Sequence, residues 1–377
     1  MVARASDGGS HVLLAPDKFK GSLTAEQVAT ALAHGLRSAM PELQLRVAPV
    51  ADGGEGTIEA AIAGGFSSRT AVVAGPLGAP VRASFAIRDD IAIIELAQAS
   101  GLRRLTGPLQ PLTATSTGTG ELIRAALEAG CHQIILGVGG SASTDGGAGM
   151  LQALGAGVLD GNGRQLKLGD WADRQELAQV DLSSLDPRLA EVEVVLACDV
   201  DNTLLGPAGA AVVFGPQKGA TAEQVRLLDD WLVRWAELAG LEFAQSSGAG
   251  AAGGVGFAAL AGLGAQARSG IELLLELTGF EQSLDDARLV ITGEGSLDEG
   301  SLGGKAPIGV ARAASARGIT TVAVAGRSTL TPAQLSSAGI AAAYSLLELE
   351  PDLAHCISSA EPLLSQIGTQ IALDWLK

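Results

Sequence analysis

The sequence predicts an α/β protein, with a doubly wound domain built from both ends of the chain and a second α/β domain inserted between them. Three observations support this prediction. Apolar runs followed by a polar loop and a helical pattern recur near both termini, around Asp17, Asp52, Glu294 and Arg327. The middle of the chain has a hairpin pattern and glycine-rich loops of its own. Proline and glycine interrupt the alternation from about residue 75, so we expect domains at 1–74 with 285–377, and at 75–284.

The composition agrees with buried parallel strands. Of the 377 residues, 47% are hydrophobic, only 3% are aromatic and 51 are glycine, so the cores are expected to consist of Ala, Val, Leu and Ile. The net charge of −16 argues against nucleic acid or an anionic membrane as a partner, because both are bound through basic patches. No apolar run reaches the length of a membrane-spanning helix. Three cysteines without a paired pattern indicate free thiols in a reducing cytoplasm.

The first strand is expected at residues 11–15, and Thr24 begins a capping-box pattern that marks the following helix. Asp17, Lys18 and Lys20 lie between the two, where α/β proteins bind ligands just beyond the carboxyl end of a strand. We include Lys18 among the expected catalytic residues, and Asp17 and Lys20 among the binding residues. Loop lysines are usually only solvated, so that alternative stays open.

The same order of strand, acidic glycine-rich turn and helix follows at residues 43–57. Asp52, Gly53, Gly54 and Glu55 form the turn and are expected to bind substrate or nucleotide. The two carboxylates are suited to hold a metal or to orient a substrate hydroxyl. Capping of the following helix is the alternative.

A hairpin and a hydroxyl-rich turn come next. Residues 81–88 and 91–95 have the pattern of two paired strands joined at Asp89 and Asp90. Residues 113–120 form a turn rich in Ser and Thr before a helix expected at 121–129. This turn either contacts a ligand or caps that helix.

The stretch 136–150 is the strongest candidate for an anion-binding loop. It joins a predicted buried strand at 132–138 to a helix at 148–154, and unpaired N–H groups before a helix favour negative charge. Asp145 is a carboxylate suited to Mg²⁺. A tight turn that uses glycine for positive φ is the alternative. The residues expected to bind phosphate are Gly139, Gly140, Ser141 and Thr144.

The same stretch resembles a dinucleotide-binding loop in its spacing. Gly137, Gly139 and Ala142 match G-x-G-x-x-A, and Asp160 follows at about the right distance. Residues 143–147 intervene before the helix, which spoils a close pyrophosphate turn. A nicotinamide-dependent oxidoreductase is therefore the minor alternative.

Another buried strand is expected at residues 192–197, and it ends in two carboxylates. Asp199 and Asp201 are the predicted catalytic residues, and Asp199 is also a predicted metal ligand. Like charges this close need a cation between them, or one of them binds a proton. Structural capping is the alternative. The binding residues expected in this region are Asn202, Gln217 and Lys218.

The C-terminal part repeats the opening pattern. A strand at 288–292 is followed by Glu294 and Asp298, and Lys305 precedes the next helix. Arg327 follows the strand expected at 320–325. We expect Asp298 to bind a metal and the other three side chains to bind substrate or nucleotide.

These loops favour phosphoryl transfer. They are rich in Gly, Asp and Lys and contain no cofactor motif, and phosphoryl transfer depends mainly on positioning and charge neutralisation. The residues alone therefore indicate a small-molecule kinase with binding loops from both domains around one cleft.

Eight segments resemble the type I glycerate kinase family and follow the family's order from residue 15 to 311. They are APDKFKGSLTAEQVA (15–29), PVADGGEGT (49–57), GTGELIRAAL (118–127), GVGGSASTDGGAGM (137–150), ACDVDN (197–202), FGPQKGAT (214–221), GAGAAGGVG (248–256) and ITGEGSLDEGSLGGKAPIGVA (291–311).

The resemblance implies ATP-dependent phosphorylation of D-glycerate to 2-phosphoglycerate in glycerate and glyoxylate catabolism. It also implies Mg²⁺ as cofactor, a Rossmann-like domain beside a second α/β domain, and a cytoplasmic enzyme. A glycerate 3-kinase and a nucleotide-binding oxidoreductase stay open as alternatives, and so does a homodimer. Ser296 stands where the family commonly has Arg. Either the phosphate site is weakened there, or Arg327 has taken over that role.

Overall fold

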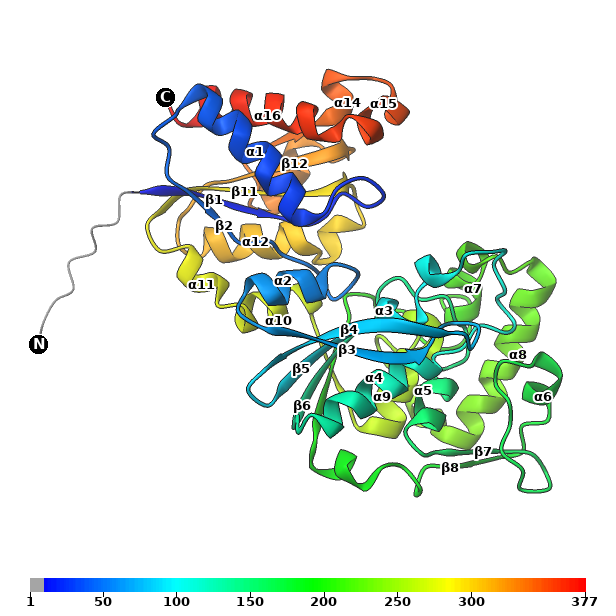
Figure 1. The fold of residues 1–377 in the computed structure, drawn as a ribbon. Coiled ribbons are helices and arrows are strands. Elements are labelled where there is room, and N and C mark those ends of the chain that lie inside the picture. Colours follow the sequence, from blue (N-terminus) through cyan, green and yellow to red (C-terminus); the bar gives the residue numbers. More distant parts are fainter. Residues whose placement is uncertain (1–9) are drawn as a thin grey trace, which may run out of the picture. The chain divides into compact units, whose positions relative to one another are not determined.

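The computed structural model describes residues 10–377, which form two compact units (Figure 1). The first unit contains both ends of the described chain, up to Asp52 and from Ile271 to Lys377, and the second contains Gly53–Gly270. A unit built from both chain ends, with a second α/β unit between them, is the predicted fold class.

A five-stranded sheet forms the middle of the first unit, in the order β13-β12-β11-β1-β2, and all its neighbouring strands run parallel. The strands are β1 (His11–Pro16), β2 (Leu45–Val47), β11 (Ala287–Leu297), β12 (Thr321–Ser328) and β13 (Ala342–Ser345). The α-helices are α1 (Ala25–Ala39), α10 (Gly270–Leu277), α11 (Phe280–Ser283), α12 (Ala306–Ser315), α13 (Pro332–Ser337), α14 (Leu346–Leu349), α15 (Leu353–Ser358) and α16 (Ala360–Trp375), and η5 (Ser301–Gly303) is a 3₁₀ turn.

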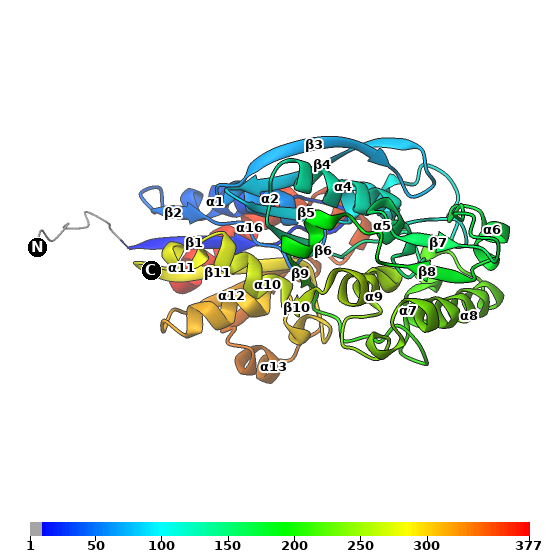
Figure 2. The same cartoon turned by 90° about the horizontal axis from the view of Figure 1, so that it is seen from below.

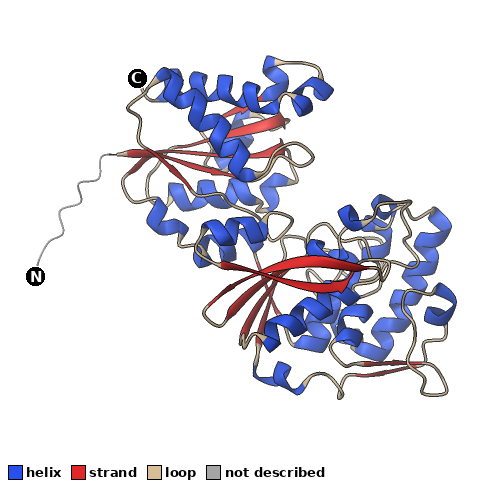
Figure 3. Cartoon of the chain, viewed as in Figure 1, coloured by secondary structure: helices blue, strands red, loops and turns tan. Residues whose placement is uncertain are grey.

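Both faces of this sheet are covered by helices (Figure 3). Successive side chains of a strand point to opposite faces, so β1 contributes to two cores. Val12 and Leu14 pack with α1 and α16, whereas Leu13 and Ala15 pack with α10, α11 and α12. This arrangement is the predicted doubly wound layer structure.

Helices α1 and α16 lie side by side and join the two ends of the chain (Figure 1). A Cβ at Gly35 would lie 1.8 Å from the carbonyl oxygen of Ser365, so the close approach of α1 to α16 requires glycine at this position. The predicted capping box at the start of α1 is present, with Thr24 and Gln27 bonded reciprocally.

The second unit contains a six-stranded mixed sheet in the order β10-β9-β6-β5-β4-β3. Strands β10 to β5 run parallel, and β4 and β3 extend the sheet as the antiparallel edge (Figure 2). The strands are β3 (Ser67–Ala74), β4 (Pro80–Arg88), β5 (Ile91–Glu95), β6 (Gln133–Gly137), β9 (Glu193–Ala197) and β10 (Gln266–Arg268), while β7 (Gly157–Leu159) and β8 (Gln179–Asp181) form a separate antiparallel pair. The predicted hairpin is therefore confirmed as β4 and β5.

One apolar core beneath this sheet contains residues from Val73 to Ala265, among them the stacked rings of Trp231 and Trp235. The helices of the unit are α2 (Thr57–Ala63), α3 (Ala97–Ser100), α4 (Thr117–Glu128), α5 (Ala148–Ala153), α6 (Trp171–Gln175), α7 (Ala210–Phe214), α8 (Ala222–Ala239) and α9 (Ala251–Leu263). Short 3₁₀ turns are η1 (Leu102–Arg104), η2 (Pro187–Glu191), η3 (Pro216–Lys218) and η4 (Leu241–Phe243).

The boundaries between the units differ from those expected near residues 75 and 284. Strand β3 pairs with β4 along its whole length, which places β3 and α2 in the second unit. Ile271, Leu275 and Phe280 pack with β1 and β11, which places all but the first residue of α10, together with α11, in the first unit. The first boundary was predicted where proline and glycine begin to interrupt the strand and helix pattern, whereas sheet pairing and core packing determine the observed units.

Two further predictions, the start of α4 and the length of β2, are corrected by the structure, and one glycine-rich segment has an unusual backbone. Helix α4 begins at Thr117, inside the hydroxyl-rich turn. The glycine-rich stretch 246–256 is partly helical, because α9 begins at Ala251, but Ala252, Gly253 and Gly254 have left-handed φ values of 53°, 68° and 94°. Strand β2 is shorter than expected, because β1 pairs with only three of its residues. Along residues 10–377, no helix combines the length and apolar character needed to cross a membrane.

Candidate active site

The loops after β1 and β11 meet at the carboxyl edge of the first unit's sheet. The backbone N–H of Asp17 donates to the carbonyl of Gly293 at 2.8 Å, and a Cβ at Gly295 would lie 3.2 Å from the backbone nitrogen of Lys20. The segment after β2 reaches the same edge, where Val50 N–H donates to the carbonyl of the last residue of β1. The predicted residues that share this edge are Asp17, Lys18, Lys20, Asp52 and Glu294.

Carboxylates at this edge are buried and repel one another. Burial, and after it the charge of Asp52, raises the pKa of Asp17 to about 8. Burial also raises the pKa of Glu294 to about 7, although a hydrogen bond from Ser301 and the charge of Lys305 act in the opposite direction. The Oε1 atom of Glu294 is buried and has no hydrogen-bond partner among the described residues. Buried carboxyl groups with pKa values near neutrality are typical of active sites.

Hydrogen bonds link Arg327, Ser296 and Asp298 just after Glu294 in the chain, near the ends of β11 and β12. The Nε of Arg327 donates to Ser296 Oγ at 3.1 Å, and that hydroxyl donates to Asp298 Oδ2 at 3.0 Å. Ser296 and Arg327 are cross-strand partners on β11 and β12. The guanidinium of Arg327 therefore lies next to Ser296, the position where the family commonly has an arginine.

In the second unit, two glycine-rich loops pack backbone against backbone beyond the ends of β6 and β9. A Cβ at Gly137 would lie 2.3 Å from the carbonyl of Gly53, and one at Gly139 would lie 2.5 Å from the Cα of Gly54. A Cβ at Gly53 would lie 3.0 Å from the carbonyl of Ala197, at the end of β9. The predicted residues Gly53, Gly54, Glu55, Gly139 and Gly140 thus form one cradle of buried and half-buried backbone, called the glycine cradle below.

The rim of the glycine cradle is polar. Glu55 is paired with the exposed guanidinium of Arg103, with 3.2 Å between Oε2 and Nε. Ser141 is buried and forms a β-bridge with Gly101, while Leu102 N–H donates to the carbonyl of Gly140 at 2.9 Å. The α3–η1 segment therefore holds the outer half of the loop 138–147 in place.

The inner half of that loop does not fit the predicted roles. Thr144 and Asp145 are completely buried. Asp145 Oδ2 accepts hydrogen bonds from both N–H and Oγ of Ser116 and from Gly149 N–H, and Oδ1 accepts from Gly147 N–H. Its complete burial and these four hydrogen bonds favour a structural role for Asp145 over the predicted metal role. Thr144 is too deeply buried to bind phosphate directly.

The predicted catalytic carboxylates after β9 are held by different partners. Asp199 Oδ1 accepts a hydrogen bond from Gly270 N–H at 3.0 Å, and Asp201 Oδ1 accepts one from Ser247 Oγ at 2.7 Å. Asn202 donates from Nδ2 to the carbonyl of Ala208 at 2.9 Å. Among residues 10–377, no three His, Cys, Asp or Glu side chains are grouped so as to hold a metal ion.

The two predicted binding residues on η3 have opposite environments. Gln217 is exposed, whereas Lys218 is buried with 2% of its surface accessible. The Nζ of Lys218 donates to the carbonyl of Ser143 in the loop 138–147. Lys218 therefore cannot contact a substrate directly in this conformation.

Comparisons with known proteins identify the family to which these loops belong. Residues 12–376 match the sequence profile of the Glycerate kinase family. The chain belongs to the glycerate kinase family.

Several relatives and one solved structure agree with this assignment. A glycerate kinase from Bacillus subtilis (strain 168) is 44% identical over 96% of this chain and 98% of its own length. A glycerate 2-kinase from Escherichia coli (strain K12) is 45% identical over 89% of this chain and 90% of its own. A Salmonella typhimurium LT2 protein solved by crystallography under the name glycerate kinase 2 superposes with a TM-score of 0.80 at 40% identity, over 97% of this chain and 98% of that one.

Membership of the glycerate kinase family makes the chain an enzyme and sets aside the oxidoreductase alternative. The structure agrees at the candidate dinucleotide loop. Helix α5 begins only after Gly147, which has a left-handed φ of 74°. Asp160 is engaged locally, by the N–H groups of Asn162 and Arg164 and by the guanidinium of Arg164.

Sequence reasoning missed three residues that support the loop 138–147. Arg174 is completely buried between the rings of Trp171 and Trp231, and burial lowers its pKa to about 10, against the opposing charge of Asp145. Ser116 fixes Asp145, and Arg103 pairs with Glu55. A buried arginine in a polar segment leaves no periodic pattern in the sequence. Of the three residues, only Ser116 lies in a segment that the sequence singled out, the hydroxyl-rich turn before α4.

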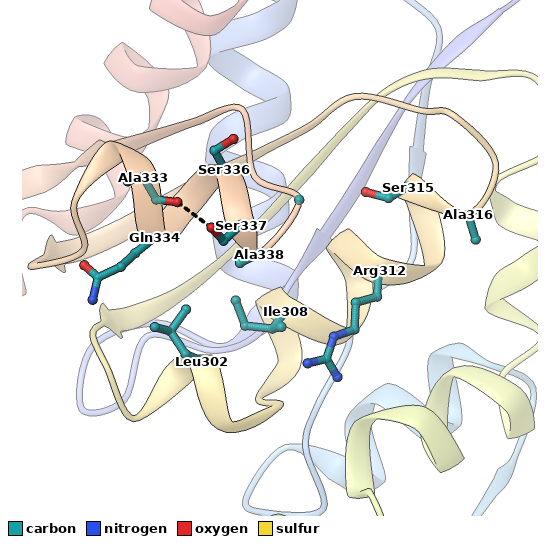
Figure 4. Close-up of a pocket in the computed structure, with 11 residues that line it drawn as sticks. Leu302, Ile308, Arg312, Ser315, Ala316, Ala333, Gln334, Ser336, Ser337 and Ala338 are labelled. Carbon is teal, nitrogen blue, oxygen red and sulfur yellow. Dashed lines mark hydrogen bonds between the residues drawn. The ribbon is translucent and has the colours of Figure 1, made fainter.

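A cavity of about 810 Å³ lies between α12 and α13 of the first unit (Figure 4). Leu302 and Gln334 lie at one end of it, and Ser315 and Ala316 lie at the other. Arg312 is the only charged residue in its lining, and none of the predicted site residues belongs to it. The candidate active site is therefore distinct from this cavity.

Proposed function

We propose that this enzyme uses ATP and Mg²⁺ to phosphorylate D-glycerate in the cytoplasm, and that the product is 2-phosphoglycerate. Family membership supports the substrate, and the name of the Escherichia coli relative supports the position of the phosphate. The observation that carries the mechanism is the buried cluster of Asp17, Asp52 and Glu294 at the carboxyl ends of parallel strands, bordered by lysines.

The cluster has the properties of a proton acceptor. A general base works best when its pKa lies near the working pH, and Glu294 has a pKa raised to about 7. Its Oε1 is buried and has no hydrogen-bond partner within residues 10–377, whereas Asp17 Oδ1 already accepts a hydrogen bond from Lys18 N–H at 2.6 Å. We therefore assign Glu294 to the substrate hydroxyl. Asp199 and Asp201 stay proposed as further catalytic carboxylates.

Cations and backbone N–H groups are proposed to bind the anionic parts of both substrates. A protein of net charge −16 repels glycerate and ATP at a distance, so local positive charge is needed. The groups assigned to the carboxylate and the phosphates are Lys18, Lys20, Lys305 and Arg327, together with the N–H groups of the glycine cradle.

The oxygen-rich loops fit Mg²⁺ as cofactor. Mg²⁺ is usually held by one or two carboxylates, with phosphate and water oxygens completing its shell, so no group of three carboxylates is required. Asp298 of the first unit and Asp199 of the second are each proposed as a ligand, because each lies just beyond a parallel strand, whereas Asp145 is completely buried. Bound Mg²⁺ supplies neutralisation of phosphate charge.

Selection of the 2-hydroxyl requires that glycerate be clamped. The 2-hydroxyl is secondary and next to the carboxylate, so a loosely held substrate would react at the primary 3-hydroxyl. Asn202, Gln217 and the rim around Ser141 are proposed to hold the 3-hydroxyl away from the reacting phosphate. Misplacement by about 1 Å costs roughly 10²-fold in rate, which is enough to discriminate two hydroxyls of one molecule.

Two measurements test the proposed function. ADP release should require D-glycerate, ATP and Mg²⁺ together, with L-glycerate as the stereochemical control. Phosphorus NMR of the product should show 2-phosphoglycerate. Mainly 3-phosphoglycerate would refute the regiochemistry but not the kinase, and no ADP release with any glycerate would refute the function itself.

A further inference from the structure

Lys218 combines two features that are rarely found together, a charged head group and almost complete burial. It ends the turn η3, and its surface is 2% accessible. Its Nζ donates to the carbonyl oxygen of Ser143, which lies 75 residues away in sequence. An ammonium group is strongly hydrated in water, so its burial is unfavourable unless the protein supplies replacement contacts.

Asp145 supplies the opposite charge. Its attraction partly offsets the burial that lowers the pKa of Lys218 to about 7. Asp145 is itself fixed by Ser116 and by the N–H groups of Gly147 and Gly149. Lys218 therefore interacts with the loop 138–147 at two neighbouring residues. Its ammonium group donates to the carbonyl of Ser143 and is attracted by the carboxylate of Asp145.

Helix α9 completes the enclosure at its kinked start. A Cβ at Gly253 would lie 2.1 Å from the carbonyl of Ser143 and 2.8 Å from Lys218 Nζ, and the φ of Gly253 is +68°. Gly146 N–H donates to the carbonyl of Gly253 at 3.0 Å, and Trp235 Nε1 donates to the carbonyl of Gly146 at 3.0 Å. Residues 251–254 are uncharged, so Asp145 is the charged group that faces the ammonium.

The loop needs this support because its own side chains are not satisfied. The hydroxyls of Ser143 and Thr144 are buried and have no hydrogen-bond partner among the described residues. Burial of a hydroxyl without a partner costs free energy, so the inner half of the loop would not keep this conformation unaided. The outer half, Gly139 to Ser141, belongs to the glycine cradle and its rim and ends only two residues before Ser143.

We propose that Lys218 is a positioning residue for phosphoryl transfer. From its buried site it holds the carbonyl of Ser143 and thereby fixes the backbone N–H groups of the glycine cradle in the productive arrangement. It does not touch substrate or nucleotide. The proposal deepens the proposed function and uses glycerate phosphorylation as one of its readouts.

Lys218→Met tests the charge, with Lys167→Met as matched control because Lys167 is an exposed lysine of the same unit. We expect kcat/KM of Lys218→Met to fall about 10- to 100-fold, as for a site displaced by about 1 Å. The loss should be largest below pH 7, where the wild-type ammonium is charged, and should narrow as the pH rises. Lys218→Arg should retain part of the activity, and Lys167→Met all of it.

Gly253→Ala tests the same contact from the opposite side. The new methyl group would press on Ser143 and on Lys218 Nζ. Gly264→Ala is the matched control, because Gly264 also has a positive φ, +63°, but nothing within 4 Å of its added Cβ. We expect Gly253→Ala to lose activity as Lys218→Met does, and Gly264→Ala to stay near the wild type.

Amide hydrogen exchange separates this proposal from the assignment of the reaction. In Lys218→Met and Gly253→Ala, exchange of a peptide covering residues 138–147 should accelerate, with α8 unchanged, whatever substrate the enzyme uses. Wild-type exchange and wild-type kcat/KM in both folded variants would overturn the positioning role. Faster exchange in an enzyme that releases no ADP with glycerate would refute the proposed function alone.

Discussion

At the scale of single residues, the carboxylate cluster of the first unit couples stability to pH. Asp17 has an ordinary pKa of 3.8, and its pKa in the folded protein is raised to about 8 by burial and by Asp52. Between these values the folded protein binds a proton that the unfolded chain has lost. The contribution of this group is therefore favourable at low pH and is lost as the pH rises through the window.

Asp17→Asn should remove this dependence. The difference in free energy of unfolding between the variant and the wild type should grow in favour of the variant from about pH 4 to pH 8. It should then level off at about 2–5 kcal/mol. Urea unfolding at a series of pH values measures this difference. A difference independent of pH would show that Asp17 is ionised in the folded protein at neutral pH.

The proposed role of Arg327 in binding phosphate is based on one contact, its hydrogen bond to Ser296. Arg327→Ala should raise KM for the phosphate-bearing substrate about 10- to 100-fold, because a charged hydrogen bond is worth about 1.5–3 kcal/mol. Arg312→Ala is the control, since Arg312 lies in the same unit but lines the cavity between α12 and α13. Equal kinetic effects of the two substitutions would show that Arg327 does not bind the nucleotide or product.

At the scale of elements, loops rather than helices create the candidate active site. The capping boxes of α1 and α8 and the hairpin of β4 and β5 form as their local sequence predicts. The glycine cradle depends instead on two loops more than 80 residues apart in sequence. Their contact requires that no side chain be present at Gly137 or Gly139.

Gly139→Ala should therefore be costly. The new methyl group would lie 2.5 Å from the Cα of Gly54, and backbone atoms can yield only if one loop moves. We expect kcat/KM to fall at least tenfold, while the melting temperature stays close to that of the wild type. Gly161→Ala is the control, because Gly161 is a loop glycine of the same unit with open space around it. Wild-type kinetics of Gly139→Ala would exclude the glycine cradle from the reaction.

At the scale of the whole molecule, the sequence predicted the architecture better than the chemistry of individual residues. Alternating strand, loop and helix patterns are local, so the doubly wound unit and most elements were predictable. Asp145 and Lys218 were assigned to metal and ligand from residue type alone. Their burial depends on Ser116, Gly253 and α8, which no local pattern connects to them. The predicted domain boundaries differ from those of the two units for the same reason, because pairing between strands far apart in sequence determines which unit a segment joins.

The two units have separate cores, and this separation predicts separate responses to mutation. The core of the first unit that contains α1 and α16 includes no residue of 53–270, and the core that contains Trp231 and Trp235 lies wholly within that range. Three of the four tryptophans, Trp171, Trp231 and Trp235, belong to the second unit, and Trp375 belongs to the first. Tryptophan fluorescence in a Trp375→Phe background therefore reports unfolding of the second unit alone.

Gly35→Ala in that background should destabilise the first unit selectively. Alanine favours a helix by about 1 kcal/mol over glycine, but here its methyl group would lie 1.8 Å from the carbonyl of Ser365 and force α1 and α16 apart. The clash should dominate. Calorimetry should show an early transition shifted down by several degrees, while the fluorescence midpoint stays constant and exposed Gly303→Ala changes neither. A parallel shift of both signals would mean that the units unfold as one cooperative body, with α1 and α16 setting the stability of the entire chain.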